Sequence, residues 1–261
     1  KYITYTNVDL AKPPLGLYAR VTSNDFSGWC KGLDTPVFDF HTHAGRWGNR
    51  AADDDIHREL GIMDAAGIDR CNLNCIYHGD AKRANDIVAR RVRAHPDRFV
   101  GVAFVTPHYP AETIPELERA FDVLGMKSLK LYPTYFQRPI DDPAYLPIFD
   151  WCNDRAIVIM CHSSYVNDGD TLTNPKRFIA LAQRYDKIRW VLAHSGNSAQ
   201  GQKQAVEAAG VCPNIYLETC TSFGEHGTIE YLVEGAGPDR VLYGSDIPIM
   251  DPRLQVGRIV T

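Results

Sequence analysis

Two histidines one residue apart end the apolar run VFDFHTH, residues 37–43. Successive side chains of a β-strand point to opposite faces, so His41 and His43 would project from the same face, about 7 Å apart along the strand. Neutral imidazole is a common metal ligand, and a catalytic zinc site uses about three protein ligands and leaves one position open. Two imidazoles so placed can share one cation, although they can also be two ordinary polar residues at a strand end.

Regularly spaced elements follow this run. Short apolar stretches alternate with stretches of helical spacing, and one strand follows the next after roughly 25 to 32 residues, the length of a βα unit. The expected strands are 37–41, 70–76, 99–105, 128–132, 157–162, 188–194, 215–218 and 241–244. The expected helices are 54–66, 81–94, 115–124, 146–155, 175–185, 199–209 and 228–234. This alternation predicts a closed (β/α)8 TIM barrel better than an open doubly wound sheet, and no Gly-x-Gly-x-x-Gly turn follows the first strand.

Titratable side chains stand where the expected strands end. Active sites of such barrels lie at the carboxyl ends of the strands. Besides the first pair, these side chains are Lys130 in the fourth strand, His162, His194 and Glu218 at the ends of the fifth, sixth and seventh, and Asp246 after the eighth. Each alone can be a satisfied polar residue, but together they predict one cluster at the barrel mouth. The remaining histidines are expected on the surface: His57, His78, His95, His108 and His226.

Cationic and aromatic residues follow some of these strand ends. Arg46 and Trp47 come after the histidine pair, and Tyr132 ends the fourth strand. Loops after barrel strands carry specificity, so these three are predicted to bind substrate, with Arg46 as a fork for a carboxylate. Single aromatic residues in loops also serve as packing residues. Glu218 can be a partner of a ligand imidazole or only an ion-pair residue.

Composition narrows the class of protein. The 261 residues are 44% hydrophobic and 23% charged, which allows a large buried core. A net charge of −4 gives no broad basic surface for nucleic acid, and no apolar run approaches the length of a membrane span. The seven cysteines are scattered through apolar runs, so we expect buried thiols and a cytoplasmic protein. Residues 1–35 show no sustained period and predict an irregular N-terminal extension before a barrel domain, residues 36–261.

Five motifs together resemble the amidohydrolase superfamily, in particular the amidohydrolase-related branch that includes aminocarboxymuconate-semialdehyde decarboxylase. They are HTH at 41–43, the strand of Lys130, His162, AHSG at 193–196 and YGSDIP at 243–248. The resemblance covers about residues 37–259. It implies that His41, His43, His162 and Asp246 bind a metal, with His194 a catalytic histidine beside it. Members usually continue after the eighth strand, so the last helix is expected to be missing or truncated here.

Three imidazoles and one carboxylate suit Zn²⁺ best, with Mn²⁺ or Fe²⁺ as alternatives. Zinc lowers the pKa of its bound water to about 7. Asp246 could take up a proton from that water, and His194 could orient or protonate the substrate oxygen. The first prediction is therefore a metal-dependent hydrolase of an amide, lactone or related carbonyl bond in a small, carboxylate-bearing molecule.

Other interpretations stay open. The same scaffold can decarboxylate an aromatic or unsaturated acid without an oxidant, with His194 or Asp246 delivering a proton to carbon. A third interpretation is a barrel without activity. Lys130 can be carboxylated between two metals, pair with a substrate carboxylate, or form a structural ion pair, and we favour a site with one metal. By analogy with the family, a homo-oligomer, in the simplest case a dimer, is expected.

Overall fold

The computed structural model describes most of the predicted barrel domain. The described residues are 36–45, 55–76, 79–165, 172–221, 223–225 and 227–260. The predicted N-terminal extension lies outside them, as do Arg46, Trp47, His78 and His226.

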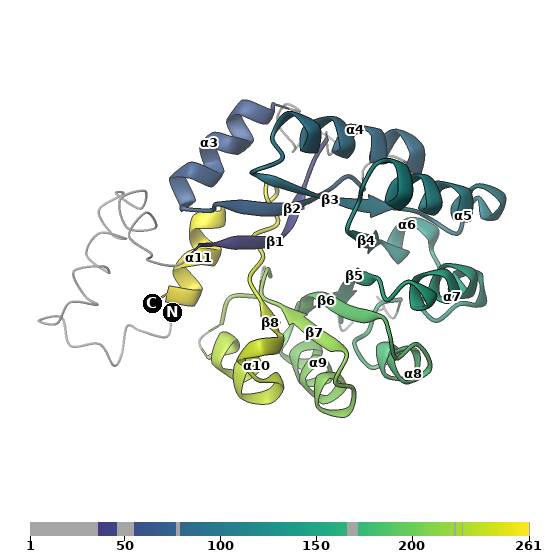
Figure 1. The fold of residues 1–261 in the computed structure, drawn as a ribbon. Coiled ribbons are helices and arrows are strands. Elements are labelled where there is room, and N and C mark those ends of the chain that lie inside the picture. The colour runs from purple at the N-terminus through teal and green to yellow at the C-terminus, as the bar shows by residue number, and fades with distance from the viewer. Residues whose placement is uncertain are drawn as a thin grey trace, which may run out of the picture.

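Eight parallel strands form one sheet in chain order, each paired with the next (Figure 1). They are β1 Phe38–His43, β2 Arg70–Asn74, β3 Phe99–Phe104, β4 Ser128–Leu131, β5 Val158–Ser164, β6 Arg189–Gly196, β7 Ile215–Glu218 and β8 Val241–Leu242. The sheet closes on itself through the segment after β8. There Thr42 forms a parallel bridge with Ile247, and the Asp246 N–H donates to the His41 carbonyl at 2.8 Å. The fold is the predicted (β/α)8 barrel.

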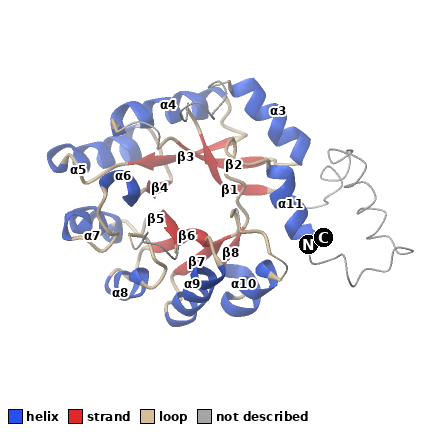
Figure 2. Cartoon of the chain, turned by 180° about the vertical axis from the view of Figure 1, so that it is seen from behind, coloured by secondary structure: helices blue, strands red, loops and turns tan. Residues whose placement is uncertain are grey.

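Helices ring the strands on the outside, as Figure 2 shows. The α-helices are α3 Ile56–Ala66, α4 Ala81–Ala94, α5 Pro110–Glu118, α6 Pro133–Phe136, α7 Leu146–Asp154, α8 Arg177–Arg184, α9 Ala199–Val211, α10 Thr228–Ala236 and α11 Pro252–Val260. Shorter turns are the π-helical Arg119–Val123 and the 3₁₀ segments Pro143–Tyr145 and Pro238–Arg240. Asp55 caps α3 by accepting the His57 N–H at 2.9 Å, as the acidic residues before this helix suggest.

The largest difference from the predicted helices is in α5. The sequence pattern predicts a helix over 115–124, but α5 begins at Pro110 and passes into the π-helical turn after Glu118. Pro110 occupies the first helical position, where its missing N–H is not needed. Pro115 lies inside the helix on its exposed side, so the Ala111 carbonyl that loses its helical partner remains at the surface.

The helix after the eighth strand is present. α11 spans nine residues, contacts α3 and lies close to β1 (Figure 1). The last helix was expected to be missing or truncated, and it is not missing, since residues 252–260 form a helix that contacts α3.

Among the residues that the structure describes, buried apolar side chains form a larger and a smaller core. The larger one fills the space between the strands and the helices, and Ile159, Cys161 and Leu192 belong to it. Side chains alternate along a strand, so the neighbouring residues point into the barrel. There a smaller cluster forms, which we call the barrel floor: Met160, Val191 and Ala193, packed with Phe40, Val158, Tyr216 and Leu242.

The cysteines were predicted to be buried and the remaining histidines to lie at the surface. Six cysteines are buried free thiols, and Cys30 lies outside the described residues. His57 and His108 are exposed and His95 is half-buried. Within the described ranges, no helix has the length and apolar character needed to cross a membrane.

Candidate functional site

A cavity of about 270 Å³ opens at the carboxyl ends of the strands. The predicted site residues that border it are His41, His43, Lys130, Tyr132, His162, His194 and Asp246, whereas Glu218 is not part of its lining. Ile76, Asn197, Ile249 and Met250 complete the lining. A larger hollow of about 670 Å³ lies between α4 and α5, but it contains none of the predicted residues, and its Arg119 is paired with Asp86 and Glu116. The smaller cavity is the candidate site.

Three potential metal ligands converge in this cavity. Nε2 of His41 lies 3.1 Å from Nε2 of His43, and Oδ1 of Asp246 lies 2.8 Å from His43 Nε2 and 3.6 Å from His41 Nε2. Ligand atoms on a tetrahedral zinc ion, each 2.0–2.1 Å from the metal, are about 3.3 Å apart. The observed spacings bracket that value, and all three residues are buried. This donor set fits a divalent cation.

The charge states of the three residues also suit a metal. Burial lowers the pKa of His41 and of His43, so both rings are neutral, as a metal ligand must be. Burial acts to raise the pKa of Asp246, but the hydrogen bond with His43 and the electrostatic effect of His43, His194 and Lys130 lower that pKa overall. Asp246 is therefore an ionised carboxylate beside two neutral imidazoles.

Glu218 fixes the orientation of His41. Its Oε2 lies 3.0 Å from Nδ1 of His41 and accepts the backbone N–H of His194 at 3.1 Å, while Oε1 accepts that of Cys220. Burial raises the pKa of Glu218, and the hydrogen bonds to its carboxylate oppose this. With the proton of His41 on Nδ1, Nε2 keeps the lone pair that a metal ligand needs. The contact favours the interpretation of Glu218 as a partner of a ligand imidazole.

A second group of potential ligands lies deeper, where His41, His194, Glu218 and Cys220 come within 4.8 Å of one another. Its nitrogen and carboxylate atoms already form hydrogen bonds. His194 Nδ1 lies 2.8 Å from the Cys220 carbonyl, and both oxygens of Glu218 are occupied. The group of His41, His43 and Asp246 is the better candidate for a cation.

His194 is placed beside this group as a neutral base. Its ring centroid lies 5.0 Å from that of His41 and 4.8 Å from that of His162. Because a carbonyl only accepts, Nδ1 must donate to Cys220, which leaves Nε2 as the acceptor nitrogen. Burial lowers the pKa of His194 to about 4.

His162 borders the cavity but is not part of the compact group of His41, His43 and Asp246, whose ligand atoms all lie within 4.8 Å. Its ring packs edge-on against Tyr132, with centroids 5.0 Å apart, and burial lowers its pKa. The structure thus brings together three of the four predicted ligands. The role of His162 as the fourth stays a prediction.

Lys130 is a fully buried cation in the same cavity. Its Nζ lies 2.8 Å from Nε2 of His41, and the side chain is 1% exposed. Burial lowers the pKa of Lys130, and the nearby Asp246 carboxylate opposes the shift. Among the described residues, Lys130 forms no ion pair with a carboxylate, so the structural ion-pair interpretation has no support.

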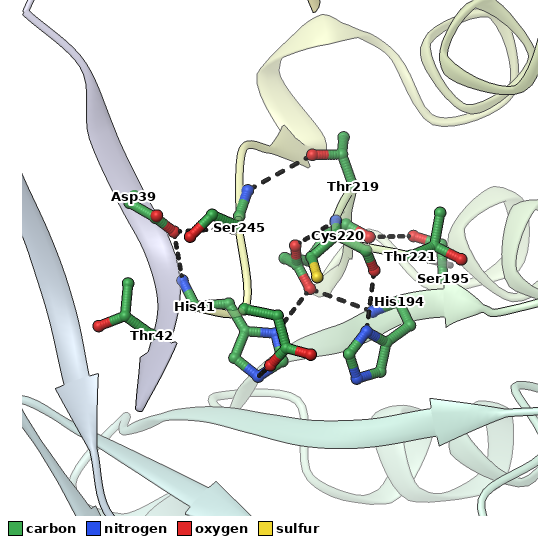
Figure 3. Close-up of polar contacts among 12 residues, drawn as sticks. Asp39, His41, Thr42, His194, Ser195, Thr219, Cys220, Thr221 and Ser245 are labelled. Atoms are coloured by element: carbon green, nitrogen blue, oxygen red, sulfur yellow. Dashed lines mark hydrogen bonds and ion pairs between the residues drawn. The ribbon is translucent and has the colours of Figure 1, made fainter. Parts of the chain in front are cut away.

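Sequence reasoning missed Asp39. This carboxylate is fully buried, and its Oδ1 accepts the backbone N–H groups of His41 and Ser245, both at 3.0 Å (Figure 3). It therefore ties β1 to the segment that carries Asp246. Burial raises its pKa to about 7. The signal was an acidic residue inside an apolar strand, because such residues are seldom buried without a partner.

The backbone around the site is strained. Six non-glycine residues of the described chain have positive φ, and four of them lie here: His194 at 67°, Ser195 at 44°, Asn197 at 48° and Asp246 at 64°. Such conformations cost of order 1 kcal/mol each and persist where the surroundings enforce them. The Ser195 hydroxyl, for example, donates to the Glu218 carbonyl at 2.8 Å.

The fold and the polar cluster define a barrel enzyme of the metal-dependent type. The amidohydrolase family matches residues 38–261, so the chain belongs to that family and is an amidohydrolase-family enzyme. This confirms the resemblance drawn from the motifs.

Several relatives are decarboxylases. The chain is 28% identical to a 2-amino-3-carboxymuconate-6-semialdehyde decarboxylase of Dictyostelium discoideum over 82 residues, which are 31% of this chain and only 23% of that protein. It is similar in structure to 5-carboxyvanillate decarboxylase from Sphingomonas paucimobilis, with TM-score 0.68, 20% identity and coverage of 87% and 92% of the two chains. The corresponding decarboxylase of Novosphingobium aromaticivorans, solved with manganese, gives TM-score 0.70 and 18% identity over 88% and 92%. At these identities the structural likeness shows the shared fold.

Proposed function

We propose that this chain is a metal-dependent decarboxylase that releases CO₂ from a small aromatic or unsaturated carboxylic acid without an oxidant. The observation that carries the proposal is the convergence of His41, His43 and Asp246 beside the Lys130 ammonium in one small cavity. Three side chains that fit a metal ion thus lie beside a lysine that can pair with a substrate carboxylate. The decarboxylases among the relatives support this reaction better than hydrolysis, which stays a prediction.

His41, His43 and Asp246 would hold the metal, with His162 as the fourth ligand. Zn²⁺ is the first expectation from the donor set, and the manganese in a related decarboxylase makes Mn²⁺ the second metal to test. When bound, the metal would act as a Lewis acid on a substrate oxygen.

The cavity limits the substrate. Its volume of about 270 Å³ is below the range of roughly 300–1,000 Å³ for pockets that take drug-sized ligands. This favours a single ring or a short open chain. Lys130 would pair with the substrate carboxylate, since it is buried and cationic, and Tyr132 would contact the substrate from the wall. Arg46 and Trp47 stay predicted substrate contacts outside the described residues.

His194 and Asp246 would handle the proton. Decarboxylation breaks the bond between the carboxyl carbon and its neighbour, CO₂ leaves, and the electron pair on the remaining carbon takes a proton. His194 is neutral with a free acceptor position at Nε2, and Asp246 is ionised. One of them must therefore accept a proton from the acidic substrate or from water before it delivers that proton to carbon.

The test is a product assay. Purified protein loaded with Zn²⁺ or Mn²⁺ is incubated with hydroxybenzoic acids, methoxylated carboxyphenols and, for comparison, lactones and amides. The proposal predicts CO₂ and a product one carboxyl group smaller, detected by mass spectrometry. A new carboxylate without CO₂ would instead support the hydrolase.

We also propose that the protein is a homodimer, by analogy with the family. Light scattering after gel filtration should give twice the chain mass of 29.2 kDa. A mass of one chain would contradict this.

A further inference from the structure

Lys130 is directed at a proposed metal ligand. Its Nζ lies 2.8 Å from Nε2 of His41, whose other ring nitrogen lies 3.0 Å from Oε2 of Glu218. Because an ammonium group only donates, Nε2 must be the acceptor in the contact with Lys130, which places the ring proton on Nδ1 against Glu218. The Lys130 ammonium therefore donates a hydrogen bond to the same lone pair that a metal at His41 would use.

The two occupants exclude each other. An imidazole nitrogen has one lone pair, in the plane of the ring, so it can accept from an N–H group or bind a metal but not both. A zinc ion would lie 2.0–2.1 Å from a ligand nitrogen, and Nζ already lies 2.8 Å from Nε2, so the metal and the ammonium would compete for one lone pair. Two positive charges so close together in a buried site also repel strongly.

We propose, on the basis of the proposed function, that Lys130 is an internal cation that occupies the metal's place at His41 and is displaced when metal binds. Displacement frees the ammonium for the carboxylate of the substrate. Metal binding and carboxylate binding are then coupled through one side chain.

The surroundings of Lys130 support this exchange. Asp246 and Glu218 are the nearby carboxylates that favour its charged form, so the ammonium offsets buried negative charge while it lies at His41. Neither carboxylate forms an ion pair with Lys130. Among the described residues that line the cavity, Lys130 is the one that carries an ammonium or guanidinium group. Once displaced, it would remain a lining residue of the cavity that the substrate enters.

The first experiment measures metal affinity by competition with a chromophoric chelator. Zn²⁺ dissociation constants are compared for the wild type, Lys130→Met and the control Lys127→Met, an exposed lysine just before β4. Removing the competing charge should tighten binding in Lys130→Met about tenfold or more, with no change in the control. Equal affinity would overturn the proposal. Weaker affinity would also overturn it, because the lysine would then supply a ligand atom. Lys130→Gln serves if the Met variant does not fold.

The second experiment tests the coupling. Saturating benzoate, an unreactive carboxylate, should tighten Zn²⁺ binding several-fold in the wild type and leave Lys130→Met unchanged. The same effect of benzoate in both proteins would overturn the role of Lys130 while leaving the metal site intact. Failure of all these proteins to bind metal would overturn the proposed function as well, so the two failures are distinguishable.

Discussion

The inside of the barrel has two layers built from the same strands. Along β5, Met160 belongs to the apolar floor and His162, two residues later, belongs to the mouth. Along β7, Tyr216 packs on the floor and Glu218 contacts His41. One step of the strand period thus separates a residue that stabilises the fold from one that can do chemistry. The position along the strand therefore decides whether a side chain lies at the floor or at the mouth. The residue type decides whether it packs in the core or can take part in catalysis.

The two layers have opposite effects on stability. Burying the apolar floor stabilises the fold by roughly 25 cal/mol per Å². The mouth instead buries neutral histidines, carboxylates and a lysine, each of which loses water and needs a hydrogen bond in return. We therefore expect changes at the mouth to alter activity and metal binding, and changes at the floor to alter stability.

Asp246→Asn should have the largest effect. Loss of the ionised ligand and proton carrier should lower the rate of CO₂ release about a thousandfold, which is about 4 kcal/mol in activation free energy. The control is Asp251→Asn, five residues after Asp246, because Asp251 is a more exposed acid that pairs with Arg253. Steady-state kinetics measure both. Full activity with metal retained in Asp246→Asn would contradict the assignment.

Asp39→Ala should affect both layers. It leaves two buried N–H groups, those of His41 and Ser245, without their acceptor, which should lower the free energy of unfolding by about 2–4 kcal/mol. Metal affinity should fall too, since this carboxylate joins the two segments that carry the ligands. Asp69→Ala is the matched control, because its exposed carboxylate also accepts one backbone N–H, that of Val37. Similar losses in the two variants on urea unfolding would argue against a special role for Asp39.

Met160→Ala should separate the floor from the mouth. The cavity it leaves should lower the free energy of unfolding by about 2–3 kcal/mol. The number of metal ions bound and the rate of CO₂ release should stay close to wild type. The control is Val123→Ala at an exposed position, which should leave the free energy of unfolding, the metal content and the rate unchanged. A large loss of metal in Met160→Ala would show that the layers are not separate.

Lowering the pH should decrease the free energy of unfolding of the metal-free protein, because of His194 at the barrel mouth. The pKa of His194 is lowered to about 4, against 6.5 in the unfolded chain, so the unfolded state binds more protons between these values. The contribution of His194 to stability is therefore fully present above pH 6.5 and is lost as the pH falls from 6.5 towards 4. From pH 7 to pH 5, His194 alone should account for about 2 kcal/mol. Urea unfolding with chelator present measures the slope, which should shrink in His194→Gln. An equal slope in both proteins would contradict the prediction.

The fold and the residue types at the mouth could be predicted from the sequence, because strand period and strand ends are local properties. The way in which these side chains come together at the mouth could not be predicted from the sequence. The register shifts between Asp39 and Thr42, which allows both Phe40 and His41 to point into the barrel. The left-handed backbone at His194 places its ring beside His41. No local pattern encodes either feature, and the same is true of the hydrogen bond between Ser245 and Asp39, which joins segments 206 residues apart.

Every role proposed for the site depends on a metal at His41 and His43, so the most direct measurement is the metal content of the purified protein by mass spectrometry. The wild type and the double variant His41→Ala with His43→Ala are compared after reconstitution with Zn²⁺ and with Mn²⁺. We predict about one metal ion per wild-type chain and loss of that ion in the double variant. A wild type without metal, or a double variant that keeps it, would contradict the central claim.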